Sequence, residues 1–266
     1  MTNLFSRFRR LKRTPVIGDN DATQFVVTSG KNSFSLAAGH TVSARDPNDT
    51  KVIRIEGLVK EYHTHIGTRR VLDGISFDVK FGEKIAVLGR NGAGKSTLVK
   101  IIGGVEPPTS GRVVRGMRMS WPIGFSGAFE PSMTGMDNIR FIARIYDVPL
   151  EETIEFVDDF AELGRQLYIP VKTYSSGMRA RLAFALSLAI NFDCFLIDEV
   201  MSVGDQRFHR KCHEALFDVR KHAAMILISH DIHILRQYCS KAVILKAGRS
   251  RVFDDIDLAI DIYSSL

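Results

Sequence analysis

The fold is decided by the stretch Gly89-Arg90-Asn91-Gly92-Ala93-Gly94-Lys95-Ser96, which matches the pattern G-x-x-x-x-G-K-[ST] at every fixed position. Its glycines let successive backbone N–H groups point at phosphate oxygens, because a Cβ atom would obstruct the approach. Lys95 can reach the β- and γ-phosphates of a nucleotide, and the Ser96 hydroxyl can bind Mg²⁺. The helix that opens at Thr97 adds the positive end of its dipole. The stretch from Gly89 to Thr97 is therefore predicted to be a loop that binds the phosphates of a nucleotide.

The segments around this loop predict an α/β fold. A short apolar strand bounded by glycines precedes the loop, and a helical run follows it until Gly103-Gly104. Helical periodicity dominates 136–190. Beyond it, apolar runs alternate with helical segments, which indicates a parallel sheet with crossover helices. Strands are predicted at 51–55, 75–79, 84–88, 194–197, 225–228 and 242–245.

Two acids, Asp198 and Glu199, directly follow the apolar run 194–197. This position corresponds to the C-terminal edge of a strand, where open α/β sheets bind their ligands. A site that hydrolyses a nucleotide needs a carboxylate that faces the metal and a group that handles the attacking water. We expect Asp198 to hold Mg²⁺ and Glu199 to orient or deprotonate the water.

The order of these motifs resembles that of the ATP-binding subunits of ABC transporters, and the resemblance covers residues 51–266. Tyr174-Ser175-Ser176-Gly177-Met178 is similar to the signature loop of that family, usually written Leu-Ser-Gly-Gly-Gln, and it leads into a helix. The resemblance implies that Ser175 and the backbone around Ser176 and Gly177 meet the γ-phosphate of an ATP molecule bound by a second subunit.

Three further positions fit the same family pattern. His230 follows the apolar run 225–228 and resembles the switch histidine that contacts the γ-phosphate. Asp205, in Ser202-Val203-Gly204-Asp205, matches the acid of the loop that crosses the dimer interface. Tyr62 matches the aromatic residue that stacks on adenine, although a lone tyrosine is as often a packing residue as a ligand.

One position departs from the family pattern. The family places a Gln after the third strand, where its carbonyl oxygen meets Mg²⁺ and the attacking water, but the candidate here is Glu130. A carboxylate also offers oxygen to a hard cation, yet it adds a negative charge beside Glu199. Either Glu130 substitutes chemically, as a metal-binding and catalytic residue, or the role of its loop is mostly mechanical.

Within the ABC family, the segments 120–122, 133–138, 156–163 and 173–178 resemble ATPases that power bacterial polysaccharide export, above all export of capsular polysaccharide. The resemblance implies a P-loop NTPase core with a mixed, largely parallel sheet, an antiparallel β subdomain, and an α-helical subdomain at about residues 125–190. Exporters of O-antigen or teichoic acid are alternatives. The segment after His230 is too short for the carbohydrate-binding domain that some O-antigen exporters carry.

The same resemblance implies a mechanism, cofactors and partners. Two copies would form a homodimer around two ATP molecules, each held with Mg²⁺ between the phosphate loop of one subunit and the signature loop of the other. Closure would change the conformation of a separate multi-span permease. The ATPase would act on it at the cytoplasmic face of the bacterial inner membrane. A soluble ABC-type ATPase that acts on nucleic acid or ribosomes is a weaker alternative, because such chains usually carry two nucleotide sites and this chain has a single phosphate loop.

Positive charge is concentrated at the start of the chain. The formal net charge is +6, and residues 1–14 contain Arg7, Arg9, Arg10, Lys12 and Arg13 but no acid. Nucleic-acid binders carry their basic surface on the folded domain, so no nucleic acid is expected as a partner. Apolar residues on the opposite helical face of 1–14 are typical of a segment that lies on anionic lipid. A solvated tail and a targeting segment are the alternatives. Residues 1–50 are predicted to be a mostly irregular extension, and 51–266 to be the nucleotide-binding domain.

Composition excludes several other classes of protein. With 266 residues, 45% apolar and 25% charged, the chain has the composition of a soluble globular protein. Its longest nearly unbroken apolar stretch, 182–190, is about half of the ~20 residues that a membrane-spanning helix needs. The three scattered cysteines form no disulfide framework and suit a reducing compartment.

Two further clusters of side chains are not assigned to the nucleotide site. Trp121, Phe125 and Phe129 either form the groove that docks the permease or pack in the core of the helical subdomain. His209 and His213 lie four residues apart on a predicted helix, a spacing that a metal ion accepts. No fourth ligand is evident, so we expect a solvated helix face there.

Overall fold

A computed structural model of the chain describes residues 27–29, 32–34, 51–65, 67–123, 129–198 and 206–265. The chain divides into two compact units, 1–47 and 48–266. In the first unit, β1 (Val27–Ser29) and β2 (Asn32–Phe34) pair antiparallel, with Ser29 opposite Asn32. The sequence did not indicate this hairpin, because three-residue strands carry too little alternation to be recognised. The basic segment 1–14 lies outside the described residues.

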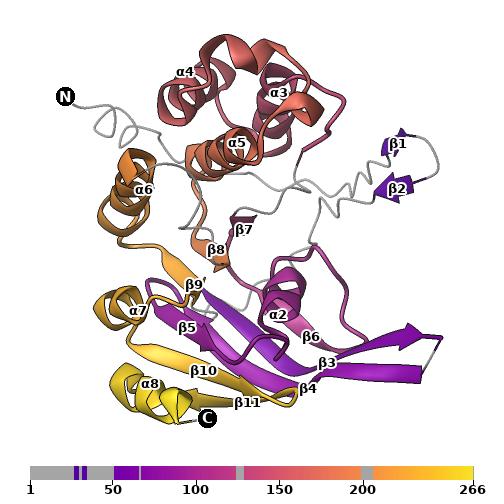
Figure 1. The fold of residues 1–266 in the computed structure, drawn as a ribbon, viewed down its shortest axis with the longest axis vertical. Coiled ribbons are helices and arrows are strands. Elements are labelled where there is room, and N and C mark those ends of the chain that lie inside the picture. The colour runs from indigo at the N-terminus through magenta and orange to yellow at the C-terminus, as the bar shows by residue number, and fades with distance from the viewer. Residues whose placement is uncertain are drawn as a thin grey trace. The chain divides into compact units, whose positions relative to one another are not determined.

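The second unit contains a six-stranded sheet with the order β11-β10-β5-β9-β8-β7 (Figure 1). Its first edge strand, β11, is antiparallel to β10, and all other neighbours are parallel. Parallel strands are buried on both faces, and all five residues of β9 are accordingly buried. The strands span Lys84–Leu88 (β5), Met119–Ile123 (β7), Cys194–Asp198 (β8), Ala224–Ile228 (β9), Lys241–Lys246 (β10) and Arg249–Phe253 (β11).

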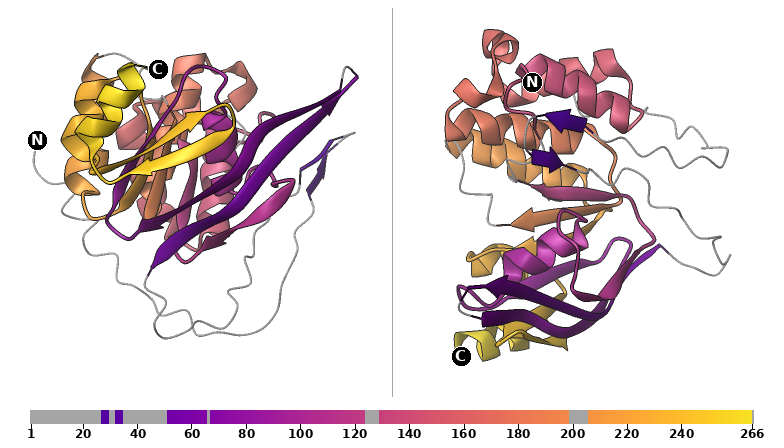
Figure 2. Two further views of the ribbon diagram at one scale, coloured as in Figure 1. Left: turned by 90° about the horizontal axis from the view of Figure 1, so that it is seen from below. Right: turned by 90° about the vertical axis from the view of Figure 1, so that its right-hand side faces the viewer.

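A three-stranded antiparallel sheet has the order β4-β3-β6, formed by β3 (Val52–Thr64), β4 (Gly67–Lys80) and β6 (Ser110–Arg115). Figure 2 shows the long strands β3 and β4 side by side. Alternate side chains of β4 are buried at Ile75, Phe77 and Val79, as the period of a half-buried strand requires. This sheet matches the antiparallel β subdomain that the sequence predicted.

The helix α2 (Lys95–Ile102) is anchored in a core shared by both sheets. One apolar cluster includes Ile55 of β3, Leu72 of β4, Val87 of β5 and Leu98 of α2. The helix is therefore fixed from several sides, and it fixes the loop that precedes it.

The helical part of the unit follows β7, and its described residues form three α-helices, with two short 3₁₀ turns between the second and the third (Figure 1). Thr134 caps the first of them, because its side chain accepts a hydrogen bond from the backbone N–H of Asp137. A stack of phenylalanine rings packs the helices together, with 5.6 Å between the centres of Phe156 and Phe160 and 6.0 Å between Phe160 and Phe184. The elements are α3 (Gly135–Ile145), α4 (Leu150–Ala161), η2 (Gly164–Tyr168), η3 (Val171–Thr173) and α5 (Ser176–Ala189).

The remaining helices connect and follow the later strands. The helix α6 (Gln206–His213) continues directly into a π-helical segment, η5 (Glu214–Val219). Beyond them lie α7 (Ile232–Tyr238) and α8 (Ile256–Ser264), the latter capped by Asp255. Among the described residues, no helix has the length and apolar character needed to cross a bilayer.

In the second unit, the sequence missed three strands, β6, β7 and β11, for identifiable reasons. Pro122 lies inside β7, and proline lacks the N–H that a strand ladder uses, so the strand signal is weak there. The structure places β7 at the edge of the sheet, where a proline is tolerated. The other two strands are short and carry exposed arginines, which hide their alternation.

Candidate nucleotide-binding site

The topology brings the ends of three parallel strands to one edge of the sheet. Strand β9 lies between β5 and β8 and pairs with both. Asp198, the last residue of β8, is opposite Ile228, the last residue of β9. Ala86 of β5 is opposite Leu227 of β9, so Gly89 and His230 lie equally far beyond that pair. Three predicted site positions, Gly89, Asp198 and His230, are thus placed side by side, at the edge where open α/β sheets bind ligands.

The phosphate loop has a backbone that only glycines can supply at two positions. A Cβ at Gly89 would lie 2.7 Å from the carbonyl oxygen of Leu245. Gly94 has φ +103°, and a Cβ there would lie 2.9 Å from Cδ2 of Leu72. Both distances are shorter than any comfortable contact, so the closely packed strands β4 and β10 require the loop to lack side chains there. The result is a cradle of backbone N–H groups at the start of α2.

Lys95 is held inside this loop. Its side chain is only 8% exposed, and Nζ donates hydrogen bonds to the carbonyl oxygens of Gly89, at 2.6 Å, and Arg90, at 3.4 Å. The first turn of α2 contains no acidic residue. Its N-cap residue is Gly94, so no side chain caps the helix there. The loop therefore concentrates a positive charge and the positive end of a helix dipole at one point, which favours an anion. Ser96 is exposed at the beginning of the same helix, and Thr97 is half-buried.

Asp198 is half-buried at the end of β8, and His230 is exposed just after β9. Asp231, next to His230, caps α7 by accepting hydrogen bonds from the backbone N–H groups of His233 and Ile234. Two predicted residues, Glu199 and Asp205, lie outside the described residues.

Tyr62 lies near the phosphate loop, beside α2. Its hydroxyl donates to Oε1 of Glu106 at 2.7 Å. Burial and the contact with Glu106 raise the pKa of Tyr62 above its ordinary value, although a hydrogen bond from the Thr97 side chain acts in the opposite direction. The residue is 36% exposed, so part of its surface is available for contact with a ligand. The proximity to Thr97 supports the prediction that Tyr62 belongs to the nucleotide site.

The signature segment starts a helix of the helical part, on an element separate from the strand ends that carry Asp198 and His230. Ser175 caps α5 by accepting a hydrogen bond from the backbone N–H of Met178 at 3.2 Å. Ser175 and Ser176 are exposed. A Cβ at Gly177 would have only Ser175 Oγ nearby, at 3.9 Å, so packing within this chain does not require glycine there.

Glu130 is fixed by neighbours in its own loop. Its Oε1 accepts a hydrogen bond from Ser132 Oγ at 2.6 Å, and this contact holds the pKa of the carboxyl below its usual value. The Glu130 backbone N–H donates to Oδ1 of Asn138 at 3.0 Å, and Asn138 Nδ2 donates back to the Glu130 carbonyl. The carboxylate is therefore ionised and bound to Ser132.

The aromatic groove is corrected by the structure. Trp121 is buried and packs against Tyr146, with ring centres 5.7 Å apart, and against Phe192, at 5.6 Å. Phe129 is buried as well, and Phe125 lies outside the described residues. Trp121 and Phe129 are core residues, because the interior of the unit offers their large apolar surfaces complete burial. They do not form an exposed docking groove.

The histidine pair on α6 is also less solvated than expected. His213 is half-buried, with its ring centre 4.9 Å from that of Phe217, and Nε2 lies 3.2 Å from the Tyr238 hydroxyl. His209 is half-buried too. Among the described residues, no group of three His, Cys, Asp or Glu side chains could hold a metal ion.

Comparison with known proteins gives the family. The sequence profile described as "ABC transporter" matches residues 72–202. The capsule polysaccharide export ATP-binding protein CtrD of Neisseria meningitidis serogroup B is 55% identical over 81% of this chain and 100% of its own length. The chain belongs to the ABC transporter ATPase family. A second relative, the ATP-binding protein BexA of Haemophilus influenzae, is 54% identical over 80% of this chain and 98% of its own length.

Solved structures of ABC ATPases share the fold. A dimeric ATP-binding cassette in a post-hydrolysis state, with ADP and Pi bound, superposes with a TM-score of 0.64 at 21% identity, covering 76% of this chain and 97% of its own. The P-loop NTPase core with its mixed sheet, antiparallel sheet and helices, predicted from the sequence, is thereby confirmed. The chain is an ATP-binding ABC ATPase.

Two residues of this ABC ATPase site were missed by the sequence reasoning. Glu106 contacts the Tyr62 hydroxyl, and Lys60 binds Glu106 with an Nζ–Oε1 distance of 2.9 Å. Lys60 and Glu106 belong to no recognisable sequence motif, because both lie outside the phosphate loop. The one available indication was that Glu106 comes shortly after the glycine pair at the end of α2.

Proposed function

We propose that this ABC ATPase binds and hydrolyses Mg-ATP as a homodimer, and that the cycle powers export of a capsular-type polysaccharide through a separate multi-span permease. The observation that carries the hydrolytic part is the meeting of Gly89, Asp198 and His230 at one edge of the sheet. The name of the relative CtrD, which is 55% identical to this chain, supports the capsular part.

The residues at this edge fit a magnesium ion bound together with ATP. Mg²⁺ usually takes one or two protein oxygens, substrate phosphates and water, rather than an all-protein cage. Ser96, exposed at the start of α2, and Asp198, at the end of β8, offer such oxygens. The ion would neutralise charge on the phosphates during transfer. Glu130 is a further candidate ligand, although its carboxylate is bound to Ser132.

The chain's own residues would divide the work of hydrolysis. Lys95 and the loop backbone hold the phosphates, and the Tyr62 ring stacks on the base. Glu199, which directly follows Asp198 in the sequence, orients or deprotonates the attacking water. His230 contacts the γ-phosphate from the end of the neighbouring strand β9.

A second copy completes the site in this proposal. Ser175, Ser176 and Gly177 stand at the start of α5, on an element separate from the phosphate loop of their own chain. They would meet the γ-phosphate held by the partner. The open space around Gly177 supports this role, since its small size serves no packing within one chain. Asp205 would lie in the loop between the two copies.

The site of action is proposed to be the cytoplasmic face of the bacterial inner membrane. ATP shifts the dimer from its open to its closed state only if the closed state binds ATP more tightly. A permease at this membrane would then respond to the closure of the dimer. The basic segment 1–14 would add contact with anionic lipid. Export of O-antigen or teichoic acid is the alternative, which the name of the relative CtrD disfavours.

The substitution Glu199→Gln tests the proposed function. We expect hydrolysis to fall by about 10²- to 10⁴-fold, because the general base is lost. ATP should then hold a dimer, detected by light scattering after size-exclusion chromatography. Glu214→Gln changes an exposed acid at the start of η5 and serves as the matched control. This variant should turn over ATP like the wild type.

Two outcomes would contradict this assignment. Unchanged hydrolysis by Glu199→Gln would mean that the base is misassigned. If the variant stays monomeric with ATP, the proposed dimer around two ATP molecules is wrong. The transport part is tested in membranes: the tagged protein should co-purify with a multi-span protein, and surface polysaccharide should disappear in cells that carry only Glu199→Gln. Co-purified RNA would favour the nucleic-acid alternative.

A further inference from the structure

The connection between α2 and β6 is fastened along strand β3. This connection is residues 103–109, and its second half, 106–109, carries the contacts described here. It is attached at both its backbone and its side chains, over three successive residues of β3. The hydrogen bonds run from Thr109 N–H to Val59 O at 2.9 Å, from Glu61 N–H to Thr109 Oγ1 at 2.9 Å, and from Lys60 Nζ to Pro107 O at 2.8 Å.

Within this connection, Glu106 binds two side chains of β3. Its Oε1 accepts a hydrogen bond from the Tyr62 hydroxyl at 2.7 Å and pairs with Lys60 Nζ at 2.9 Å. The Lys60 ammonium also lies 5.1 Å from the centre of the Tyr62 ring, over its face. Three side chains thus close a small triangle, in which the carboxylate and the ammonium both hold the tyrosine.

The protonation states suit this triangle. Burial alone would raise the pKa of Glu106, but hydrogen bonds from Lys60 and Tyr62 outweigh it and keep the pKa below its ordinary value. Burial and Glu106 raise the pKa of Tyr62. At neutral pH the carboxyl is therefore charged and the phenol keeps the proton that it donates. The Lys60–Glu106 pair is sheltered, with side chains 11% and 23% exposed, so solvent weakens it less than a surface pair.

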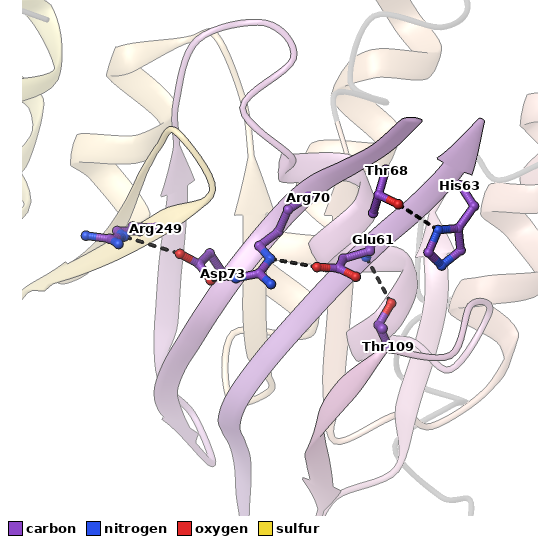
Figure 3. Close-up of polar contacts among 7 residues, drawn as sticks. All are labelled: Glu61, His63, Thr68, Arg70, Asp73, Thr109 and Arg249. Atoms are coloured by element: carbon purple, nitrogen blue, oxygen red, sulfur yellow. Dashed lines mark hydrogen bonds and ion pairs between the residues drawn. The ribbon is translucent and has the colours of Figure 1, made fainter. Parts of the chain in front are cut away.

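The side chain of Glu61, next to Tyr62 in sequence, belongs to a different set of ion pairs (Figure 3). Glu61 accepts a hydrogen bond from Arg70 Nε at 2.7 Å, and Arg70 also binds Asp73, which in turn pairs with Arg249. Successive side chains of a strand point to opposite faces, so Glu61 and Tyr62 work on different sides. Glu61 consequently offers a matched control: a carboxylate next to Tyr62 in sequence that does not contact its ring.

We propose that Glu106 and Lys60 are positioning residues, which fix the Tyr62 ring so that one side is held by the ammonium and the other receives the base of ATP. This inference rests on the proposed binding of ATP with Tyr62 against the base. Because Glu106 belongs to the connection that follows α2, the ring and the phosphate loop share one rigid support. The site is thus arranged in advance for a nucleotide with a base, and a ring that needs no ordering on binding gives higher affinity.

The test separates the base from the phosphates. Affinities for Mg-ATP and for Mg-tripolyphosphate, which has no base, are measured by calorimetry on the full-length protein. For Glu106→Ala we expect the Kd for ATP to rise about three- to tenfold, the effect of one lost hydrogen bond. The Kd for tripolyphosphate should stay within about twofold of wild type, because its contacts in the phosphate loop are unchanged.

Two further variants check the mechanism. Glu106→Gln keeps an oxygen that accepts from Tyr62, so it should recover part of the lost affinity. In a Tyr62→Phe background, Glu106→Ala should have little additional effect, since the shared hydrogen bond is already absent. The control Glu61→Gln should bind both ligands like the wild type.

The inference is overturned if Glu106→Ala leaves ATP affinity unchanged. It is also overturned if ATP and tripolyphosphate weaken equally, because that result describes general damage to the domain. If the wild-type protein binds Mg-ATP no more tightly than Mg-tripolyphosphate, the Tyr62 ring has no role in binding the base. Failure of the wild type to bind either ligand would instead remove the proposed function itself.

Discussion

Gly94 shows how tightly single residues of the phosphate loop are constrained. It combines a left-handed backbone, at φ +103°, with close neighbours on β4, Val71 and Leu72. Gly74 also has a positive φ, +71°, but a Cβ there would have no atom within 4 Å. The two glycines therefore separate the cost of backbone strain from the cost of a steric clash.

We expect Gly94→Ala to lose Mg-ATP binding and to destabilise the protein by about 2–4 kcal/mol, because strain and clash add. Gly74→Ala should cost about 1 kcal/mol through strain alone and keep its affinity for ATP. Urea unfolding and calorimetry measure the two quantities. Equal affinities for ATP in both variants would contradict the cradle described here.

Glu130 is predicted to stand where the family pattern has a Gln, and its charge can be removed without losing its oxygen. For Glu130→Gln we expect a kcat between that of the wild type and about fivefold higher, because removing a negative charge near the phosphates is worth on the order of 1 kcal/mol. Hydrogen bonds from Ser132 lower the pKa of Glu130. The carboxyl is thus ionised at pH 6 and at pH 8, and the ratio of the two enzymes should be the same at both. Ser132→Ala, which keeps the charge, is the control, and a large loss of activity in Glu130→Gln would show that the carboxylate is needed.

At the scale of elements, α6 is attached to the helical part by aromatic contacts of Phe208 and by ion pairs with the end of α4. Phe208 meets Phe160 with ring centres 5.7 Å apart, and Lys211 Nζ lies 3.1 Å from Oε1 of Glu162. Lys211 also donates to the carbonyl oxygen of Asp159 at 2.7 Å. These contacts tie α6 to the end of α4, and Phe208 further reaches Phe184 on α5, the helix that begins at the signature segment. The two parts of the domain are coupled here.

This attachment predicts unequal costs for its components. Phe208→Ala should destabilise the protein by about 3–5 kcal/mol, because a buried ring leaves a cavity. Lys211→Ala should cost about 1 kcal/mol, since the lysine is partly sheltered and binds a backbone carbonyl as well. The matched control Arg140→Ala removes an exposed i,i+3 pair with Asp137 and should cost under about 0.5 kcal/mol. Denaturant unfolding gives all three values, and a Lys211→Ala variant as stable as Arg140→Ala would argue against the coupling.

Sequence reasoning worked where local patterns carry the structure. The glycines of the phosphate loop, the apolar runs of β5, β8 and β9, and the helix starts are local features, so they were readable without coordinates. Trp121 was not readable, since its burial depends on Tyr146 and Phe192, which are distant in sequence. The contact between Tyr62 and Glu106 was equally invisible, because it depends on how the α2–β6 connection lies along β3.

At the scale of the molecule, the basic segment 1–14 predicts binding to membranes. Deleting these residues should weaken sedimentation with vesicles that contain anionic lipid, because each lysine or arginine near such a surface contributes about 1 kcal/mol. Neutral vesicles and high salt serve as controls, since screening should remove the effect. Equal sedimentation of the full-length and shortened chains would mean that the segment is only a solvated tail.

The two edges of the six-stranded sheet have a consequence for how molecules of this protein can meet. One edge strand, β7, contains Pro122, which has no N–H to share, and the other, β11, exposes Arg249 and Arg251. Both features discourage the addition of a strand from another molecule. Growth of the sheet from one molecule into the next is therefore disfavoured at both borders, which helps crowded copies of this protein to stay separate.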